Sequence, residues 1–347
     1  MSDLKTLVSC RICGGEFSSE TLVLNNSPLA NELALSRSEA LKAEKFPLQV
    51  VMCSTCKHFQ LKHIVSPDRL FSNYIYKSGT SNFFREHFKS LAKVIHGFQE
   101  GYQLKVLEIG SNDGILLDEL KSLGIRCVGL EPSRQLVNEC LERGLDVFYG
   151  FLNEDLVSDL NKNRGAFDVV VGNNVFAHID DLLGAFKCAN QLLKTKGIFI
   201  FEVADFSKIR EKGIFDSIYH EHMSFHTVTG LGLLAELSEF AIEKFTYLES
   251  HGGSFRFFLK KGVSMSISPK IEEQIEKETS TGLGSPLILS QLQKDIARRR
   301  IAVSDFIDKR DKRRLLVGYG APAKAVTFIS AMELGNVGIT AILDDNI

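Results

Sequence analysis

The chain has 347 residues, with 41 basic and 43 acidic side chains, a formal net charge of −2 and 44% hydrophobic residues. This composition is typical of a folded globular protein of two or three domains, and it excludes a chain that is disordered throughout. The near-neutral charge argues against nucleic acid and anionic membranes as partners, because both require a dense basic surface.

No apolar run approaches the roughly 18 residues of a membrane span. The start of the chain lacks the basic-then-apolar pattern of a signal peptide. Seven cysteines without an export signal predict a cytoplasmic protein, in which thiols stay reduced and paired cysteines favour metal binding. The sequence contains no coiled-coil pattern from which an oligomeric state could be predicted.

Two CxxC pairs lie in the loop-rich N-terminal part of the chain. The four candidate ligands are Cys10, Cys13, Cys53 and Cys56. Four thiolates complete the tetrahedral shell of one Zn²⁺ ion, which predicts a structural rather than a catalytic metal site. Four free thiols or a redox pair are the alternatives. His58 and His63 are alternative ligands, but we expect both to be surface residues.

The next part of the chain holds a helical stretch at 81–95, and then short apolar runs alternate with helical patterns over 104–205. This alternation predicts a parallel sheet covered by helices. We expect strands at 105–110, 126–131, 146–150, 167–174 and 197–204. We expect helices at 116–124, 133–144 and 180–197.

A glycine-rich turn, Glu108-Ile109-Gly110-Ser111-Asn112-Asp113-Gly114, follows the first of these strands and opens a helix. Glycines there allow a tight turn and the close approach of a ligand. The ExGxxxG spacing differs from the GxGxxG of dinucleotide-binding proteins, and the acidic Glu108 and Asp113 repel a pyrophosphate. Acidic groups suit instead the cationic amino acid part of S-adenosylmethionine (SAM).

Other strand ends are consistent with the same ligand. Glu131 ends the next strand, where a carboxylate can accept both ribose hydroxyls. An apolar pair follows the third strand and an Asn-Asn pair ends the fourth, at the crevice where such sheets bind ligands. The predicted SAM-binding residues are Glu108, Gly110, Asn112, Asp113, Gly114, Glu131, Phe151, Leu152, Asn173 and Asn174.

A cluster of acid–base side chains follows the fifth strand. It contains Tyr219, Glu221 and His222, and His178 follows another strand end. Histidine and glutamate can take a proton from a carbon next to a carbonyl group, and tyrosine or a second histidine can stabilise the enolate oxygen. The HxH spacing also allows a metal cluster, and a set of solvated loop residues is the plainer alternative.

The C-terminal part starts with paired strands at 242–260, followed by helices at 270–281 and 287–313. The second helix is strongly charged, which is typical of a solvated helix face. A strand, a glycine turn, a helix and a strand then end the chain. One such unit cannot bury its own faces, so we expect it to be incomplete.

Several segments recur in the same order in one enzyme family: CRICGG, CSTCKHFQL, SPLAN, LEIGSNDGILL, NNVFAHIDD, IYHEHMSF, HGGSFRFF and GYGAPAKAV. Over nearly its whole length the chain resembles the SAM-dependent sugar C-methyltransferases, in particular the C-3′-methyltransferases of nucleotide-linked 4-keto deoxysugars. The resemblance implies an α/β fold: a central Rossmann-like SAM-binding parallel sheet with helices on both faces, a small N-terminal zinc-binding domain and a C-terminal Rossmann-like unit. We place the zinc-binding domain at 1–66, the SAM-binding domain at 67–240 and the C-terminal unit at 241–347. We expect the C-terminal unit to bind the substrate and to be truncated.

The resemblance also implies a mechanism. A base removes the proton alpha to the 4-keto group of a nucleotide sugar, and the enolate carbon attacks the SAM methyl group. By motif, His222 would be the base, Glu221 would orient or assist it, and Tyr219 and His178 would stabilise the enolate oxygen. The substrate-binding candidates are Tyr74 or Tyr76, His251 and Lys324.

Three other functions remain open from the sequence. An O- or N-methyltransferase has the same fold and also needs only a base. A zinc-ribbon regulatory or binding protein with a degenerate enzyme core is disfavoured by the neutral net charge. A nicotinamide oxidoreductase would use the turn at Gly318-Tyr319-Gly320, which lacks the third glycine of the usual motif.

Overall fold

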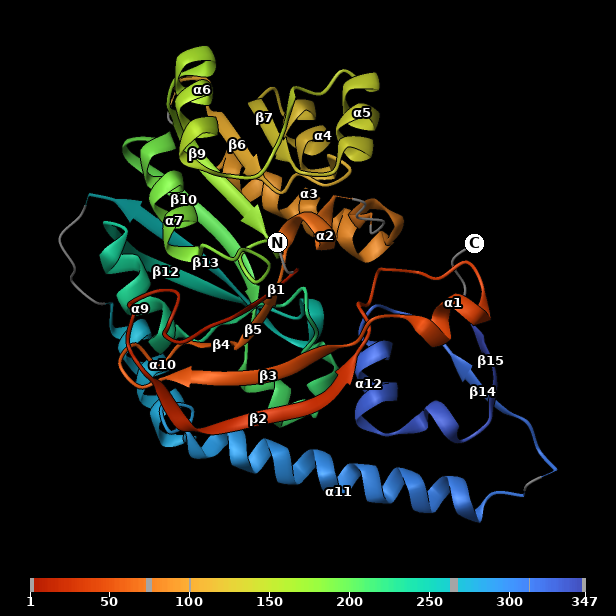
Figure 1. The fold of residues 1–347 in the computed structure, drawn as a ribbon. Coiled ribbons are helices and arrows are strands. Elements are labelled where there is room, and N and C mark those ends of the chain that lie inside the picture. Colours follow the sequence, from red (N-terminus) through yellow and green to blue (C-terminus); the bar gives the residue numbers. More distant parts are fainter. Residues whose placement is uncertain (1–2, 73–76, 100, 263–267, 312, 345–347) are drawn as a thin grey trace.

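The computed structural model describes residues 3–72, 77–99, 101–262, 268–311 and 313–344. A seven-stranded sheet forms its centre (Figure 1). Its strands are β6 (Lys105–Ile109), β7 (Arg126–Glu131), β8 (Val147–Tyr149), β9 (Phe167–Asn173), β10 (Leu193–Ala204), β12 (Phe240–Leu248) and β13 (Ser254–Lys261). Their order is β12-β13-β10-β9-β6-β7-β8. The strands from β6 to β10 run parallel to one another, and β13 is antiparallel to both of its neighbours, β10 and β12.

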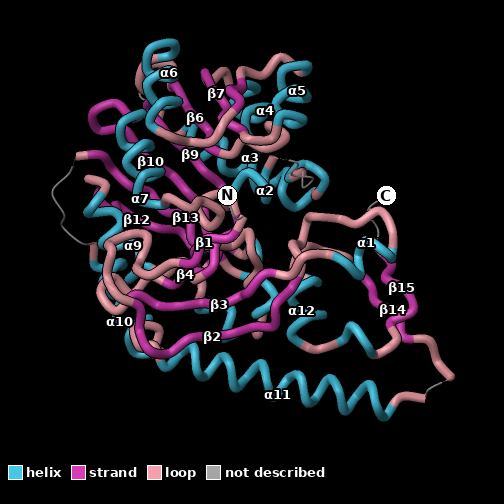
Figure 2. Tube along the Cα trace, viewed as in Figure 1, coloured by secondary structure: helices cyan, strands magenta, loops and turns pink. Residues whose placement is uncertain are grey.

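Helices cover both faces of this sheet (Figure 2). On one face pack α3 (Asn82–His96) and α4 (Ile115–Ser122), with α5 (Arg134–Glu142) against β8. On the other face pack α6 (Glu154–Arg164), α7 (Leu182–Leu192), α9 (Val228–Leu237) and α10 (Pro269–Ser280). Because alternate strand side chains point to opposite faces, Val169 and Val171 join the first core and Val170 the second. The Rossmann-like fold predicted from the sequence is confirmed.

The N-terminal domain is a separate antiparallel sheet. It contains β2 (Phe17–Ser27), β3 (Phe46–Cys53) and β4 (Phe59–Leu61), and its fourth strand is β11 (Ser224–Phe225), from the segment that follows β10. Beside it, β1 (Leu4–Thr6) pairs with β5 (His63–Val65). Short helices follow at α1 (Arg37–Lys42) and α2 (Pro67–Phe71). The contribution of β11 ties the N-terminal sheet to the acid–base segment.

The C-terminal part packs mainly on the N-terminal sheet. Its long helix α11 (Leu287–Lys309) lies along β2, where Gln293 Oε1 accepts a hydrogen bond from the Val23 amide at 2.8 Å (Figure 1). A parallel pair, β14 (Leu316–Tyr319) and β15 (Ile339–Leu343), flanks α12 (Ala325–Ala331). Further short helices are η1 (Ser78–Thr80), α8 (Ser207–Lys212), η2 (Phe215–Ser217), η3 (Ser250–Gly252) and η4 (Leu334–Asn336).

Several details differ from the sequence-based expectations. The boundary that we placed at residue 241 falls inside β12, because β12 and β13 continue the central sheet beyond β10. The helix expected at 180–197 ends at Leu192, since Leu193 already pairs with Phe167 of β9. Helix α6 was not predicted; it begins after Asn153, whose side chain accepts from the Leu156 amide.

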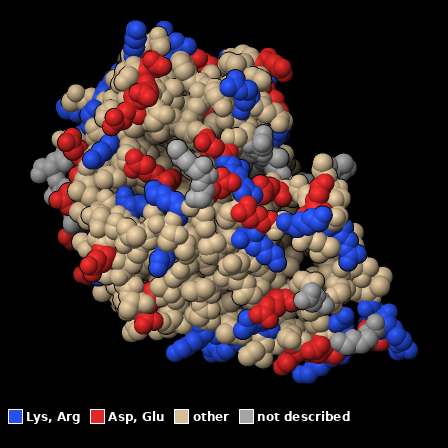
Figure 3. Space-filling model, viewed as in Figure 1, with Lys and Arg blue, Asp and Glu red and all other residues tan. Residues whose placement is uncertain are grey.

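The charged helix α11 carries its basic side chains next to acceptors. Arg300 pairs with Glu333 at 2.6 Å, Arg298 pairs with Asp295, and Arg299 donates to the Gly213 carbonyl oxygen. On the face shown in Figure 3, acidic and basic side chains are interspersed. Within the described ranges, no helix is both long enough and apolar enough to cross a membrane.

Candidate functional site

The chain turns tightly between β6 and α4. Gly110 and Gly114 have positive φ angles of 67° and 73°, and Asn112 between them has one of 49°. A Cβ atom on Gly110 would lie 2.8 Å from Cγ2 of Val175, in the loop after β9. Glycine therefore lets the turn pack against this loop while its backbone stays accessible to a ligand.

Two buried carboxyl groups border this turn. Glu131 accepts hydrogen bonds from the Asn112 amide and the Ser133 amide, each at 2.8 Å and each on a different oxygen. Glu108 Oε2 is buried and has no hydrogen-bond partner among the described residues. Burial raises the pKa of both carboxyl groups, that of Glu108 well above its usual range. A ligand that brings a positive charge and hydroxyl groups fits this pair.

The segment before α3 docks onto the glycine-rich turn through the short helix η1 (Ser78–Thr80). The Ser78 amide donates to Asn112 Oδ1 at 3.0 Å, and the Gly79 amide donates to Asp113 Oδ2 at 2.8 Å. The other oxygen of Asp113 is buried without a hydrogen bond in the part of the chain that the structure describes. The two side chains thus hold η1 at the turn, a role that the sequence analysis did not assign.

The ends of β8 and β9 complete this edge of the sheet. Both polar side-chain atoms of Asn173 are buried, with no hydrogen bond among the described residues. Asn174 has a positive φ of 56°, and its amide donates to the carbonyl oxygen of Glu202 at 2.9 Å. Phe151 and Leu152 are half-buried against the N-terminal core and the central core, respectively. The predicted cofactor residues therefore lie at the carboxyl ends of four neighbouring strands.

Two imidazole rings lie against each other in the loops near this edge. The ring centroids of His178 and His222 are 5.0 Å apart, and the Tyr219 ring lies 4.1 Å from that of His222. Nδ1 of His178 is 2.9 Å from the Glu221 carbonyl oxygen, and Nδ1 of His222 is 2.6 Å from that of Ser217. Burial lowers the pKa of His178 to about 4 and that of His222 well below its usual range. Because each neutral ring donates its Nδ1–H to a carbonyl, Nε2 carries the lone pair.

The Glu221 carboxyl group faces the N-terminal domain. Its Oε1 accepts a hydrogen bond from Asn31 Nδ2 at 2.6 Å, while Oε2 is buried without a partner in the described ranges. Burial raises the pKa of Glu221 to about 7, against the opposing effect of Asn31. This carboxyl group therefore changes its protonation state near neutral pH. Asn31 closes the SPLAN segment, but the sequence analysis gave it no role.

The substrate-binding candidates come from separate segments. His251, which has a positive φ of 51°, lies with its ring 5.2 Å from that of Phe84. The charges of His251 and Lys324 add to the effect of burial in lowering the pKa of His222, so the fold brings both toward the histidine pair. Tyr74 and Tyr76 lie outside the described residues.

The four predicted metal ligands meet at one point. The Sγ atoms of Cys10, Cys13, Cys53 and Cys56 all lie within 4.8 Å of one another. Sγ of Cys10 lies 3.6 Å from that of Cys56, and Sγ of Cys13 lies 3.5 Å from that of Cys53. Both distances are close to the ~3.8 Å expected between thiolates around a tetrahedral Zn²⁺. Tight turns support each pair, with the Gly14 amide donating to the Cys10 carbonyl oxygen at 2.9 Å. The donor set fits zinc, and four sulfurs leave no open coordination position.

The two histidines considered as alternative ligands lie elsewhere. His58 is buried with its ring 5.6 Å from that of His226, which corrects the expectation of a surface residue. His63 contacts Thr6 Oγ1 at 3.0 Å and Gln49 Oε1 at 3.3 Å. The cysteines therefore form the cluster without them.

Three family models match successive parts of the chain: a zinc binding domain at 10–71, a methyltransferase domain at 80–244 and a C-methyltransferase C-terminal domain at 249–347. The C-methyltransferase NovU of Streptomyces niveus is 26% identical over 353 aligned positions, covering 100% of this chain and 84% of NovU. The chain is a SAM-dependent C-methyltransferase. SAM is therefore its cofactor, and the four-cysteine cluster is its zinc site.

Other relatives of this C-methyltransferase match a smaller part of its chain. The mitochondrial ubiquinone biosynthesis O-methyltransferase of Rattus norvegicus is 30% identical over 29% of this chain and 31% of that protein. Among solved structures, the magnesium protoporphyrin IX methyltransferase of Synechocystis with bound S-adenosylhomocysteine (SAH) has a TM-score of 0.41. It is 14% identical and covers 51% of this chain and 83% of that one.

The C-methyltransferase also contains a charged cluster that the sequence analysis missed. Glu202 in β10 is buried, and its two oxygens contact Arg256 Nε and His87 Nε2, each at 2.6 Å. Burial alone would raise the pKa of Glu202, but His87 and Arg256 outweigh it and lower the pKa. Because Asn174 donates to the backbone of Glu202, this cluster holds the end of β10 next to the loop that carries His178.

The contact at Gly110 gives a test of the cofactor turn. We expect Gly110→Ala to weaken SAH binding about tenfold or more, since overpacking costs ~1–3 kcal/mol and the new methyl group displaces the turn from Val175. Gly124→Ala is the matched control, because Gly124 has a φ of 74° and no atom within 4 Å of the added Cβ. Titration calorimetry measures both affinities. Equal affinities in the two variants would mean that the Val175 contact does not shape the site.

Proposed function

We propose that this enzyme transfers the SAM methyl group to the carbon alpha to the ketone of a nucleotide-linked 4-keto deoxysugar. The resemblance to sugar C-methyltransferases supports this substrate class. The observation that carries the chemistry is the half-buried His222, whose lowered pKa keeps it neutral and whose Nδ1 is held against the Ser217 carbonyl oxygen. A neutral imidazole with a fixed Nε2 lone pair is suited to take a proton from carbon.

The cofactor would lie at the carboxyl ends of β6, β7 and β9. Glu131 would accept the ribose hydroxyls, since each of its oxygens keeps a lone pair after accepting one backbone hydrogen bond. Glu108 and Asp113 each keep a buried oxygen without a described partner, which suits the ammonium group. SAM, when bound, supplies an electrophilic methyl group to the enolate carbon.

The side chains around His222 would divide the remaining work. His222 Nε2 takes the alpha proton, and the electron pair of the C–H bond moves into the enolate. Tyr219, whose ring lies beside that of His222, donates a hydrogen bond to the enolate oxygen. His178 is less suited than we expected to donate a hydrogen bond to the enolate oxygen. Its Nδ1–H is directed to the Glu221 carbonyl oxygen, and its Nε2 only accepts. We assign it instead to supporting the His222 ring.

The experiment combines the enzyme with SAM and a panel of nucleotide-linked 4-keto deoxysugars. We expect a product heavier by one methyl group, with the new group on carbon by NMR. In D₂O with SAH in place of SAM, the substrate should take up deuterium at the alpha carbon. A product methylated on oxygen or nitrogen, without deuterium uptake, would contradict carbanion chemistry and favour an O- or N-methyltransferase.

The protonation of Glu221 predicts a pH dependence. Its pKa of about 7 leaves it neutral below that pH and ionised above it. By motif, Glu221 assists His222, and we expect its ionised carboxylate to favour the imidazolium that forms when His222 takes a proton. We therefore expect the rate of deuterium uptake to rise about tenfold per pH unit up to pH 7 and then to level off.

Glu221→Gln should remove this acid limb and lower the plateau. The variant should also have a higher free energy of unfolding than the wild type at pH 8, because a raised carboxyl pKa costs stability as the group ionises. An acid limb that persists unchanged in Glu221→Gln would assign it to another group.

A further inference from the structure

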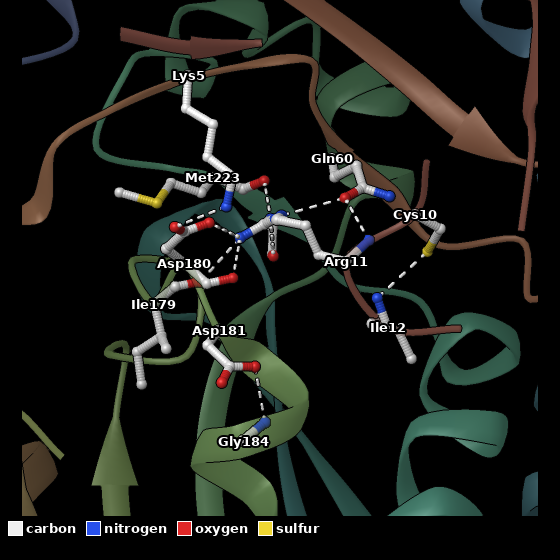
Figure 4. Close-up of polar contacts among 11 residues, drawn as sticks. Lys5, Cys10, Arg11, Ile12, Gln60, Ile179, Asp180, Asp181, Gly184 and Met223 are labelled. Carbon is white, nitrogen blue, oxygen red and sulfur yellow. Dashed lines mark hydrogen bonds and ion pairs between the residues drawn. The ribbon is translucent and has the colours of Figure 1, made fainter. Parts of the chain in front are cut away.

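Arg11 lies between the first two cysteines of the zinc site, and its guanidinium group points away from Cys10 toward Asp180 and Met223 (Figure 4). Only 5% of its side chain is exposed. Nε donates to Gln60 Oε1 at 3.1 Å. The Arg11 amide also donates to this oxygen, at 3.3 Å, so the backbone and the side chain are fixed together.

The other donors of Arg11 reach two segments that are distant in the sequence. Nη1 donates to the carbonyl oxygens of Ile179 at 2.9 Å and Asp180 at 2.8 Å. Nη2 donates to the carbonyl oxygen of Met223 at 2.6 Å and to Ser224 Oγ at 2.7 Å. With the bond to Gln60, these contacts use all five N–H groups of the guanidinium.

These acceptors directly follow the two histidines of the proposed active site. Ile179 is the residue after His178, and Met223 is the residue after His222. One planar group therefore fixes the backbone next to both imidazole rings. The two segments also meet directly, since the Met223 amide donates to the Ala177 carbonyl oxygen at 2.8 Å.

The charge of Arg11 faces the carboxylate of Asp180, with Nη1 3.7 Å from Oδ1. Asp180 also contacts Lys5 Nζ at 3.5 Å (Figure 4). A lysine at position 11 would keep the charge but offers three donors from a single atom, so it cannot reproduce the planar fork.

We propose that Arg11 is a positioning residue that sets the relative placement of His178 and His222, and that the zinc site determines where Arg11 stands. This inference rests on the proposed function of the histidine pair. It gives the zinc domain a role in proton abstraction, although no cysteine touches the reacting atoms. SAM binding should be nearly independent of Arg11, because none of its acceptors is a predicted SAM-binding residue. Among the predicted SAM-binding residues, only Asn173 and Asn174 share a segment with these acceptors.

The test compares Arg11→Lys with Arg69→Lys in the full-length, zinc-loaded enzyme. Arg69 is a suitable control because it pairs with Asp3, Glu32 and Glu44 within the N-terminal part of the chain. We expect kcat for methylation and the rate of deuterium uptake to fall about 100-fold in Arg11→Lys, as for a displacement of roughly 1 Å at a reacting group. The dissociation constant of SAH should stay within about twofold. Arg69→Lys should match the wild type in both.

A second readout does not depend on turnover. In the SAH complex, the side-chain ¹⁵N resonances of His178 and His222 should shift in Arg11→Lys, whereas that of His63 should not. If Arg11→Lys fails to fold, Ser224→Ala removes one acceptor and should show the same shifts with a smaller, about tenfold, loss of rate. Unchanged resonances of the histidine pair and an unchanged kcat in a folded variant would overturn the proposal. If the wild type methylates none of the sugars, the proposed function is contradicted but the Arg11 proposal is not. The ¹⁵N resonances of His178 and His222 then still test the role of Arg11.

Discussion

Deuterium uptake at the alpha carbon should fall about 10³-fold in His222→Asn, within the 10²–10⁴ that a general base contributes. Asparagine keeps a polar group of similar size but has no lone pair basic enough to take the proton. SAH affinity should be unchanged, because His222 belongs to a different segment from the cofactor turn. Proton NMR of the nucleotide sugar in D₂O measures the uptake, and calorimetry measures the affinity.

The control for this variant is His96→Asn, at the end of α3, where the side chain is exposed. It should match the wild type. The lowered pKa of His222 adds an expectation: the base stays neutral to well below pH 6.5, so any loss of rate between pH 6 and pH 7 belongs to Glu221. Deuterium uptake in His222→Asn at the rate of the wild type would remove His222 from the mechanism.

Loss of zinc should have the largest effect on stability. We expect Cys53→Ser to lower the thermal midpoint by about 10 °C or more, because structural zinc contributes roughly 10 kcal/mol at neutral pH and serine is a poor ligand. Cys53 is buried, and it packs in the same core as α7 and α9, so the damage should spread beyond the N-terminal domain. Calorimetry and metal analysis measure the midpoint and the zinc content.

Cys127→Ser is the control for this variant. Cys127 is half-buried in β7, outside the four-cysteine cluster, and its Sγ contacts the Leu117 carbonyl oxygen at 3.5 Å. It should keep one zinc per chain and a midpoint close to that of the wild type. A Cys53→Ser protein with full zinc content and an unchanged midpoint would show that the cluster does not stabilise the fold.

The sequence was sufficient for the local features of the fold. The strands from β6 to β10 have apolar runs of the right length, and each is followed by a turn signal. Both CxxC pairs predicted a cluster, which the structure contains. Even the missed helix α6 has a readable signal: Asn153 as the N-cap, acidic residues in the first turn and Gly165 after the last.

The features that were not predicted depend on long-range packing. The edge strands β12 and β13 have no pattern that distinguishes a hairpin of a separate domain from an extension of the central sheet. Asn31 meets Glu221 only through the fold. Arg11 lies inside a metal motif, where an arginine by itself predicts no contact. Three of its acceptors are backbone carbonyl oxygens, which any sequence supplies. A side chain that contacts backbone groups far away in the sequence produces no motif with a fixed residue spacing, so the sequence alone does not predict the contact.

The short strand β11 has a consequence for how the chain folds during synthesis. Both cysteine pairs and strands β2 to β4 leave the ribosome early, but the N-terminal sheet gains β11 only after β10 has been made. Domains generally fold as units from the N-terminus, at a synthesis rate of ~5–20 residues per second. The N-terminal sheet therefore has an unpaired edge at β4 until β11 has been synthesised. The histidine pair is assembled only when Ser224 and Phe225 pair with that edge.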